Sequence, residues 1–203
     1  MSEEQRLAWE RKYQMQGIVW AKAHDEWFKI ADGERVLDLG CGSGKSCSSL
    51  AGKIVAADFS MSALRMLGSS APKASPVCCD VTKLPFSDGA FDIVRASFVL
   101  GHLEPKERSA AIGEIRRVLR QGGRLALEVF STSDSRLVMG GKLSRSRSTE
   151  DDGISHRYFD EAEVSDILSD FIDVSMSEET WEQRIGPKKT MKRSIIRALA
   201  TRP

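Results

Sequence analysis

A glycine-rich turn directly after a short apolar segment constrains the fold of this chain more than any other feature. The segment 35–39 (RVLDL) is followed by three glycines that alternate with other residues, at Gly40, Gly42 and Gly44. Short apolar runs bounded by glycine are typical of strands that are buried on both faces of a sheet. The segment therefore predicts a buried strand whose carboxyl end turns sharply into the next element.

Strand-like and helix-like segments alternate along the rest of the chain. Apolar runs predict strands at 35–39, 53–57, 76–79, 91–97 and 123–130. Composition and helical spacing predict helices at 3–30, 45–51, 60–67, 105–120 and 160–169, with Gln121-Gly122-Gly123 ending the fourth. A long loop is expected at 131–153, followed by two strands, 171–177 and 194–200, as an edge hairpin. Such alternation predicts right-handed βαβ units and a parallel sheet.

Bulk composition fits one globular domain. The chain has 203 residues, 41% of them hydrophobic and 29% charged, and its net charge of +1 gives no overall field toward nucleic acid or a membrane. The charged first residues are not expected to form a signal peptide, and no apolar run approaches the ~20 residues that span a bilayer. The cysteines, Cys41, Cys47, Cys78 and Cys79, include no C-x-x-C pair. We therefore expect free thiols, a cytoplasmic location and no metal site.

Three kinds of ligand-binding turn resemble this glycine pattern. A phosphate-binding P-loop would use Gly44-Lys45-Ser46, but it needs a glycine at position 39, where Leu39 stands. A dinucleotide fingerprint needs its third glycine at position 45, where lysine stands. The third kind, G-x-G-x-G after an acidic residue, suits S-adenosylmethionine (SAM), which has no phosphate and which glycines allow the loop to approach closely. A tight turn without any ligand is a further interpretation.

An acidic residue follows the predicted second strand. Asp58 lies 20 residues after Asp38, and a carboxylate there can accept hydrogen bonds from both hydroxyl groups of a ribose. Asp38 itself can support the turn or accept a hydrogen bond from an amino group of the ligand. Because SAM and NAD both carry a ribose diol, Asp58 alone does not distinguish these two cofactors.

These residues belong to a longer series of motifs. The motifs are 36–44 (VLDLGCGSG), 57–60 (ADFS), 79–86 (CDVTKLPF), 91–94 (FDIV) with 100–103 (LGHL), and 117–123 (RVLRQGG). In this order they resemble the class I SAM-dependent methyltransferases, in the subgroup called methyltransferase type 11, over about half of the chain. The resemblance implies an α/β fold of three layers: a doubly wound, seven-stranded, mostly parallel sheet of Rossmann-like type, with its last strand antiparallel.

The resemblance also implies how a cofactor would be held. Asp58 would bind the ribose, Phe59 would flank the adenine, Asp80 would accept from the adenine amino group, and the N–H of Val81 would reach the ring. The implied cofactor-binding set is Asp38, Gly40, Cys41, Gly42, Gly44, Asp58, Phe59, Asp80, Val81 and Ser97. The cofactor would be SAM and its product S-adenosylhomocysteine. Relatives also imply a helical cap at 1–30 and a substrate-side loop at 131–160, within a single domain over 1–203.

His102 is the candidate catalytic residue. Methyl transfer is an in-line displacement in which the protein mainly aligns the acceptor and excludes water. An acidic acceptor also needs a base, and His102 lies five residues after Ser97, in the loop that relatives place beside the methyl group. An ordinary imidazole would give activity that falls below pH ~6.5. The alternative is that His102 only packs or caps the loop. Trp9 and Tyr13 could likewise line the acceptor pocket or pack the first helix.

The end of the chain is basic. From Arg184 onward there are seven lysines or arginines and no acid, namely Arg184, Lys188, Lys189, Lys192, Arg193, Arg197 and Arg202. They could hold an RNA backbone, as in a tRNA wobble-uridine methyltransferase, or they could protect an edge hairpin from aggregation. We expect a small-molecule acceptor, and no membrane partner. The alternatives are methylation of tRNA and a SAM-binding regulatory protein without catalysis.

Overall fold

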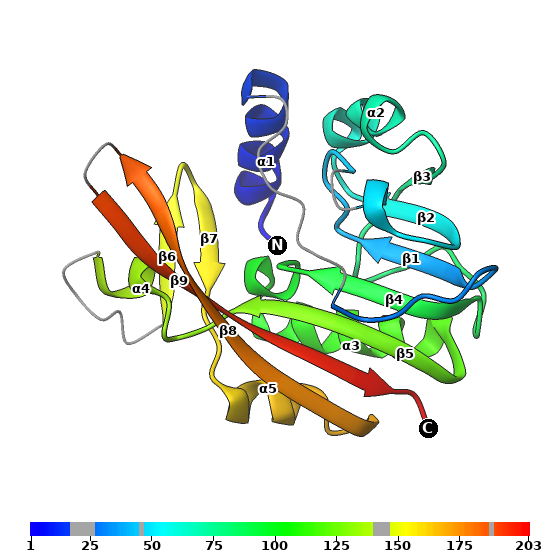
Figure 1. Ribbon diagram of the computed structural model, residues 1–203. Coiled ribbons are helices and arrows are strands. Elements are labelled where there is room, and N and C mark those ends of the chain that lie inside the picture. Colours follow the sequence, from blue (N-terminus) through cyan, green and yellow to red (C-terminus); the bar gives the residue numbers. More distant parts are fainter. Residues whose placement is uncertain (17–26, 45–46, 140–146, 187–188) are drawn as a thin grey trace.

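A seven-stranded sheet forms the centre of the computed structural model, which describes residues 1–16, 27–44, 47–139, 147–186 and 189–203 (Figure 1). The strand order is β3-β2-β1-β4-β5-β9-β8, and β9 is antiparallel to both of its neighbours while the other pairs are parallel. The strands are β1 Arg35–Leu39, β2 Lys53–Asp58, β3 Ser75–Cys78, β4 Phe91–Ser97, β5 Leu119–Phe130, β8 Ile172–Gly186 and β9 Lys189–Thr201. The predicted mostly parallel sheet, with its last strand antiparallel, is confirmed.

Helices cover both faces of this sheet. They are α1 Glu3–Gln16, η1 Cys47–Ser49, α2 Met61–Ser70, η2 Leu100–His102, α3 Pro105–Val118, α4 Ser135–Met139 and α5 Glu161–Ile167. Figure 1 shows α1 and α2 above the sheet and α3 and α5 below it, with the small hairpin of β6 Ser148–Asp151 and β7 Ile154–Arg157 beside α1. Among the described helices none has the length and apolar character needed to cross a bilayer.

Alternation along the strands explains the three layers. In a strand, successive side chains point to opposite faces of the sheet. Leu37 and Val94 belong to the core that includes α3 and α5, whereas their neighbours Val36 and Ile93 belong to the core under α2. All four side chains are fully buried. A strand buried on both faces needs apolar residues on both, as Val36 with Leu37 and Ile93 with Val94 provide.

Two predicted helices are shorter than expected. α1 ends at Gln16, residues 27–30 are not helical, and residues 17–26 lie outside the described part of the chain. After the glycine turn the structure has only the 3₁₀ helix η1 in place of a helix over 45–51, and Lys45 and Ser46 are not described. In contrast, α2 begins as predicted, because the hydroxyl of Ser60 accepts a hydrogen bond from the N–H of Ala63 as an N-cap.

The predicted glycine stop after the fourth helix is wrong. α3 ends at Val118, and Leu119 already pairs with β4 as the first residue of β5. The ladder is irregular between there and residue 124, so 120–123 form a bulge. A Cβ on Gly123 would lie 2.8 Å from the carbonyl oxygen of Arg120, so glycine lets the chain fold back closely inside the strand.

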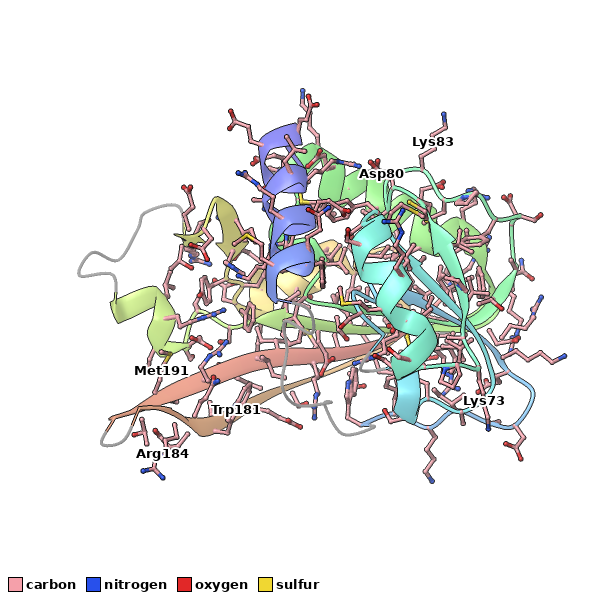
Figure 2. All side chains as sticks on the ribbon, turned by 90° about the horizontal axis from the view of Figure 1, so that it is seen from above. Lys73, Asp80, Lys83, Trp181, Arg184 and Met191 are labelled. Carbon is pink, nitrogen blue, oxygen red and sulfur yellow. The ribbon has the colours of Figure 1, made fainter. Side chains whose placement is uncertain are left out.

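The closing hairpin is longer than predicted. β8 and β9 stay paired beyond the other strands, out to Gly186 and Lys189 (Figure 1). Figure 2 shows Trp181, Arg184 and Met191 along this outer part of the hairpin. The segment 131–153 is not one loop, since it contains α4 and β6. The outer hairpin, α4 and the β6–β7 pair thus form one side of the molecule, next to the carboxyl ends of the parallel strands.

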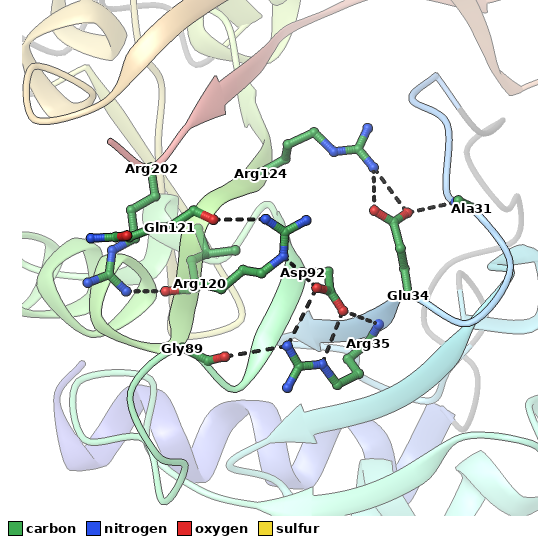
Figure 3. A network of polar contacts seen from close by, with 10 residues as sticks. Ala31, Glu34, Arg35, Gly89, Asp92, Arg120, Gln121, Arg124 and Arg202 are labelled. Carbon is green, nitrogen blue, oxygen red and sulfur yellow. Dashed lines mark hydrogen bonds and ion pairs between the residues drawn. The ribbon is translucent and has the colours of Figure 1, made fainter.

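An ion-pair network links the amino ends of β1 and β4, at the end of the sheet opposite the glycine turn (Figure 3). The carboxylate of Asp92 accepts from the backbone N–H of Arg35 at 2.8 Å, from Nε of Arg35 at 3.1 Å and from Nε of Arg120 at 2.7 Å. Arg124 and Glu34 form a second pair at 3.0 Å. The Arg35 guanidinium holds the pKa of Asp92 well below its usual range.

Replacing Asp92 by alanine is expected to lower the free energy of unfolding by about 1–2 kcal/mol, since both arginines are about half exposed and the pairs are partly screened. The Tm should fall by a few degrees. The pKa of Asp92 is lower in the folded state than in the unfolded state. The stabilisation is therefore fully present above pH ~3.9, where an unfolded aspartate ionises, and it is lost as the pH falls below that value. Urea denaturation at several pH values measures this. Asp88→Ala, at an exposed carboxylate, should change stability little; an equal loss for both variants would contradict the assignment.

Candidate functional site

One cavity of about 800 Å³ lies at the carboxyl ends of β1, β2 and β4. Its walls come from the glycine turn, the ends of β2 and β4, helix α1, and the facing sides of β8 and β9. Figure 2 shows two of its lining residues, Asp80 and Trp181, on opposite sides of the view from above. The cavity therefore joins the predicted cofactor end to a second end under the hairpin.

The glycine turn forms the floor of the first end. Gly40, Cys41 and Gly42 line the cavity. At Gly42, with φ of +53°, a Cβ would lie 2.6 Å from the hydroxyl oxygen of Tyr13, so a side chain here would collide with α1. Gly44 was predicted to contact the cofactor, but it does not line the cavity; its Cβ position faces Leu67 of α2 at 2.1 Å. Gly44 serves helix packing instead.

Asp58 fits the predicted role of a diol acceptor. Its side chain is buried on the cavity wall, where one oxygen accepts the N–H of Gly42 and the other accepts the N–H of Ser60, each at 2.9 Å. Each carboxylate oxygen has two lone pairs, so both can accept a further hydrogen bond. Burial raises the pKa of Asp58 to about 6. A neutral ligand that donates two hydroxyl hydrogens would compensate this buried charge.

Asp38 supports the turn through a buried polar chain. Its carboxylate lies 3.6 Å from Nη1 of Arg95 and 2.8 Å from Sγ of Cys47. Arg95 lies 3.5 Å from Glu128 on β5, and the hydroxyl of Ser97 donates to the same carboxylate at 2.6 Å. Burial raises the pKa of Asp38. Asp38 and Ser97 both line the cavity, as predicted, while their side chains hold the strand ends together.

Arg6 of α1, which the sequence did not indicate, covers the predicted adenine end of the cavity. Phe59, Asp80 and Val81 all line the cavity. Asp80 accepts from the N–H and the hydroxyl of Thr82 at 2.8 and 2.7 Å, and its other oxygen is paired with Arg6 of α1. The Arg6 guanidinium also lies 5.4 Å from the centre of the Phe59 ring. The Asp80 carboxylate is therefore already supplied with donors.

His102 lies between the two ends of the cavity. Its Nδ1 is 2.7 Å from the carbonyl oxygen of Ser155, which can only accept, so Nδ1 carries the proton and Nε2 is left as an acceptor. The ring makes edge contacts with Trp9 at 5.1 Å and with His156 at 4.9 Å. Burial lowers the pKa of His102 to about 4. The imidazole is therefore neutral at pH 7, with its tautomer fixed by the backbone of β7.

Trp9 and Tyr13 pack the first helix and also line the cavity. They stack on each other at 5.7 Å and are buried against α2. The second end of the cavity is lined by residues that the motifs did not identify: Phe98, Phe130, Glu179, Trp181, Arg193 and Arg197. Arg193 and Arg197 are four residues apart, and this even spacing is the signal that could have placed both arginines on one face of a strand.

The basic segment does not form a continuous surface within the described residues. Arg193 is paired with Asp134 at 2.8 Å and Arg197 with Glu128 at 3.0 Å, and both arginines are buried. Arg202 donates to backbone carbonyl oxygens. Lys188 lies outside the described residues.

The described part of the chain also holds no group of three or more His, Cys, Asp or Glu residues that could bind a metal ion.

Comparisons with known proteins agree with this geometry. Residues 37–127 match the family model of a methyltransferase domain of type 11. Curated relatives include the demethylmenaquinone methyltransferases of Mycolicibacterium vanbaalenii, 41% identical over 58% of this chain and 51% of that protein, and of Mycobacterium tuberculosis, 37% identical over 63% and 57%. The chain thus spans about half the length of the curated relatives it matches.

Solved structures share the fold over most of the chain. A SAM-dependent methyltransferase from Methanosarcina mazei has a TM-score of 0.71 at 23% identity, covering 85% of this chain and 94% of that one. The 1,6-didemethyltoxoflavin N1-methyltransferase of Burkholderia thailandensis, solved with its substrate and S-adenosylhomocysteine, has a TM-score of 0.60 at 18% identity, covering 99% and 79%. The glycine turn, Asp58 and His102 all lie inside residues 37–127, the segment that matches the model of a type 11 methyltransferase domain.

Proposed function

We propose that this chain transfers the methyl group of SAM to a small-molecule acceptor and releases S-adenosylhomocysteine. The observation that carries the proposal is the single cavity that joins the glycine turn and Asp58 at one end to His102 and the aromatic residues under the hairpin at the other. The relatives named demethylmenaquinone methyltransferases and the toxoflavin enzyme, which also act on small molecules by name, support it.

The cofactor end would use the residues that line it. Asp58 would accept both ribose hydroxyls, Phe59 and Val81 would contact the adenine, and Gly40 with Cys41 would allow the methionine part to approach the turn. Asp80 would contribute less than the family pattern implies, because Arg6 and Thr82 already donate to it. SAM supplies an activated methyl group on a positively charged sulfur.

The chemistry left to the protein is alignment and proton removal. The walls beyond His102 hold the acceptor in line with the methyl group and keep water away. With SAM bound, its methyl group would be transferred to the acceptor atom while the electron pair of the broken bond stays on sulfur, and Nε2 of His102 would take an acidic proton of the acceptor. His102 is suited to this because Nδ1 is already engaged by Ser155.

Residues 1–203 would act together as one domain. Helix α1 contributes Arg6, Trp9 and Tyr13 to the cavity, which supports a covering role for the N-terminal segment. In the substrate-side segment 131–160, Ser155 positions His102. The paired, buried state of Arg193 and Arg197 gives RNA no open basic surface there, so a small molecule remains the favoured acceptor.

Thermal-shift titration tests the cofactor assignment. SAM and S-adenosylhomocysteine are each expected to raise the Tm by about 5–10 °C at ~100 times their dissociation constants, because binding to the folded state contributes roughly 2.7 kcal/mol there. NAD and ATP should give no shift, since the turn lacks the glycine spacing of either phosphate-binding motif. A clear shift with NAD and none with the two SAM-type ligands would show that the proposal is wrong.

A further inference from the structure

The end of the cavity beyond His102 has flat aromatic walls. The rings of Phe98 and Phe130 stack with their centres 4.6 Å apart and their planes at 28°, and Trp181 of β8 contributes a third ring. Aromatic faces of this kind favour a planar ligand, which can stack on them with little loss of conformational freedom.

Phe98 occupies a strained backbone position at this wall. Its φ is +63°, in the left-handed region that bulky residues rarely adopt. The N–H of Phe98 donates to the carbonyl oxygen of Glu128 at 2.8 Å, which holds the chain in this conformation directly after β4. Strained residues cluster at ligand sites, where the surrounding structure keeps them in place for a purpose other than stability. The strain at Phe98 marks this wall as a binding surface.

Arg193 brings a cation to the same wall. Its guanidinium carbon lies 5.1 Å from the centre of the Phe130 ring and 5.8 Å from that of Trp181. Nε donates to Asp134 at 2.8 Å and Nη1 donates to Gln183 at 2.7 Å. Within the described part of the chain Nη2 of Arg193 has no hydrogen-bond acceptor, and it is not one of the buried nitrogens that lack a partner. Since Arg193 lines the cavity, Nη2 is available to a bound group.

The charges around Phe130 do not balance. Asp134 faces Arg193 and also accepts the backbone N–H of Arg136 at 2.9 Å. The Arg136 guanidinium lies 4.8 Å from the Phe130 ring, and among the described residues its Nε and Nη2 are buried without a hydrogen-bond acceptor. Two guanidinium groups thus lie beside the Phe130 ring, and the Asp134 carboxylate is paired with the guanidinium of Arg193. Buried donors without acceptors are costly, and a bound anion would compensate the excess positive charge.

Three other carboxylates of this region are already engaged. Glu179 is paired with Arg197, and Glu178 accepts from the hydroxyls of Ser131 and Ser194. Glu128 accepts from Arg197 at 3.0 Å. These pairs leave Arg193 and Arg136 as the cations that lack a full complement of acceptors near the aromatic wall.

We propose that the methyl acceptor is a planar aromatic acid, whose ring lies against Phe98, Phe130 and Trp181 and whose anionic group pairs with Nη2 of Arg193. Arg136 adds positive charge from behind the Phe130 ring. Arg193 is then the residue that selects acidic over neutral acceptors. This inference rests on the proposed function, because it assigns the substrate class of the same cavity.

The test uses the full chain saturated with S-adenosylhomocysteine and three probes, measured by calorimetry at pH 7.5. 2-Naphthoate is expected to bind at least about tenfold more tightly than neutral 2-naphthalenemethanol, since a charged hydrogen bond to the anion is lost in the alcohol. Cyclohexanecarboxylate, an anion without a flat ring, should bind more weakly than naphthoate. Arg193→Gln should reduce naphthoate binding to the level of the alcohol and leave the alcohol unchanged. Lys192→Gln, at the adjacent exposed position, should change neither.

Several results would overturn the inference. These are equal binding of the naphthoate and the alcohol, no naphthoate binding at millimolar concentration, or a preference that persists in Arg193→Gln. If Arg193→Gln no longer folds, Arg136→Met serves instead, because it removes a guanidinium with buried nitrogens that lack acceptors and should weaken naphthoate binding several-fold. Failure of the protein to bind S-adenosylhomocysteine would contradict the proposed function, whereas normal binding of it without an anion preference contradicts only this inference.

Discussion

Replacement of Asp58 by alanine is expected to weaken SAM binding by about 100-fold. The carboxylate would lose two charge-assisted hydrogen bonds to the ribose, each on the order of 1.5–3 kcal/mol before water compensates. A net loss near 2.7 kcal/mol corresponds to two factors of ten in the dissociation constant. The variant also loses the bond that holds the N–H of Gly42 at the turn. Calorimetry with SAM on the purified variant measures the change.

Asp80→Ala is the matched control for this prediction. Asp80 lines the same cavity, but its two oxygens already accept from Thr82 and Arg6, so its removal should cost SAM much less affinity. The pH dependence gives a second readout: with the pKa of Asp58 raised to about 6, protonation below that pH should weaken SAM binding in the wild type and not in Asp58→Ala. Equal or reversed losses for the two variants would mean that Asp58 is not the ribose ligand.

The second large effect concerns His102. His102→Ala is expected to lower the methyl-transfer rate by about 10²–10⁴-fold, the usual range for loss of a general base, while SAM affinity stays nearly unchanged. The reason is geometric, because Nδ1 is bound to Ser155 and the free Nε2 is the nitrogen that can meet an acceptor. Single-turnover rates with an acceptor that the wild type methylates, beside calorimetry with SAM, separate the two quantities. Full turnover by the variant would remove His102 from the mechanism and leave catalysis to alignment alone.

The pH profile differs from the one expected of an ordinary imidazole. Since burial lowers the pKa of His102 to about 4, the neutral form persists through pH 6.5, and the acid limb of activity should lie near pH 4. His156 provides a control, because it contacts the His102 ring but does not line the cavity. His156→Leu should change stability more than the rate. Burial lowers its pKa to about 3, so the folded state should lose stability as the pH falls below ~6.5, where an unfolded histidine takes up a proton.

Local patterns accounted for much of the fold. The apolar run before the glycines predicted β1 at its observed bounds, Arg35–Leu39, and Ser60 predicted the start of α2, because both depend on neighbouring residues alone. The junction at Val118 could not be predicted, since strand pairing with β4 takes over from the helix before the glycines are reached. Tertiary pairing overrode local propensity there.

Parts of the candidate site were likewise predictable from local sequence, and other parts depended on tertiary packing. The spacing predicted that Asp58 lies beside the glycine turn, and its carboxylate accepts the N–H of Gly42, because the two strand ends are separated by one unit of nearly fixed length. Gly44 does not line the cavity, and only its packing against Leu67 shows which side of the turn it faces. Arg6 was missed, because its contact with Asp80 depends on where α1 lies over the sheet.

The sequence by itself determined the alternation of strands and helices in the first half of the chain, the glycine turn and the place of Asp58 at the end of the second strand, since these depend on periodicity and on residues close in the chain. Only the tertiary structure decided what faces the acceptor. Arg193 reaches Phe130 and Asp134 across about 60 residues of chain, and the basicity of His102 depends on burial beside Trp9 and His156. Burial and charge compensation are properties of the packed molecule, and the free energies that set a pKa or pair an arginine arise there.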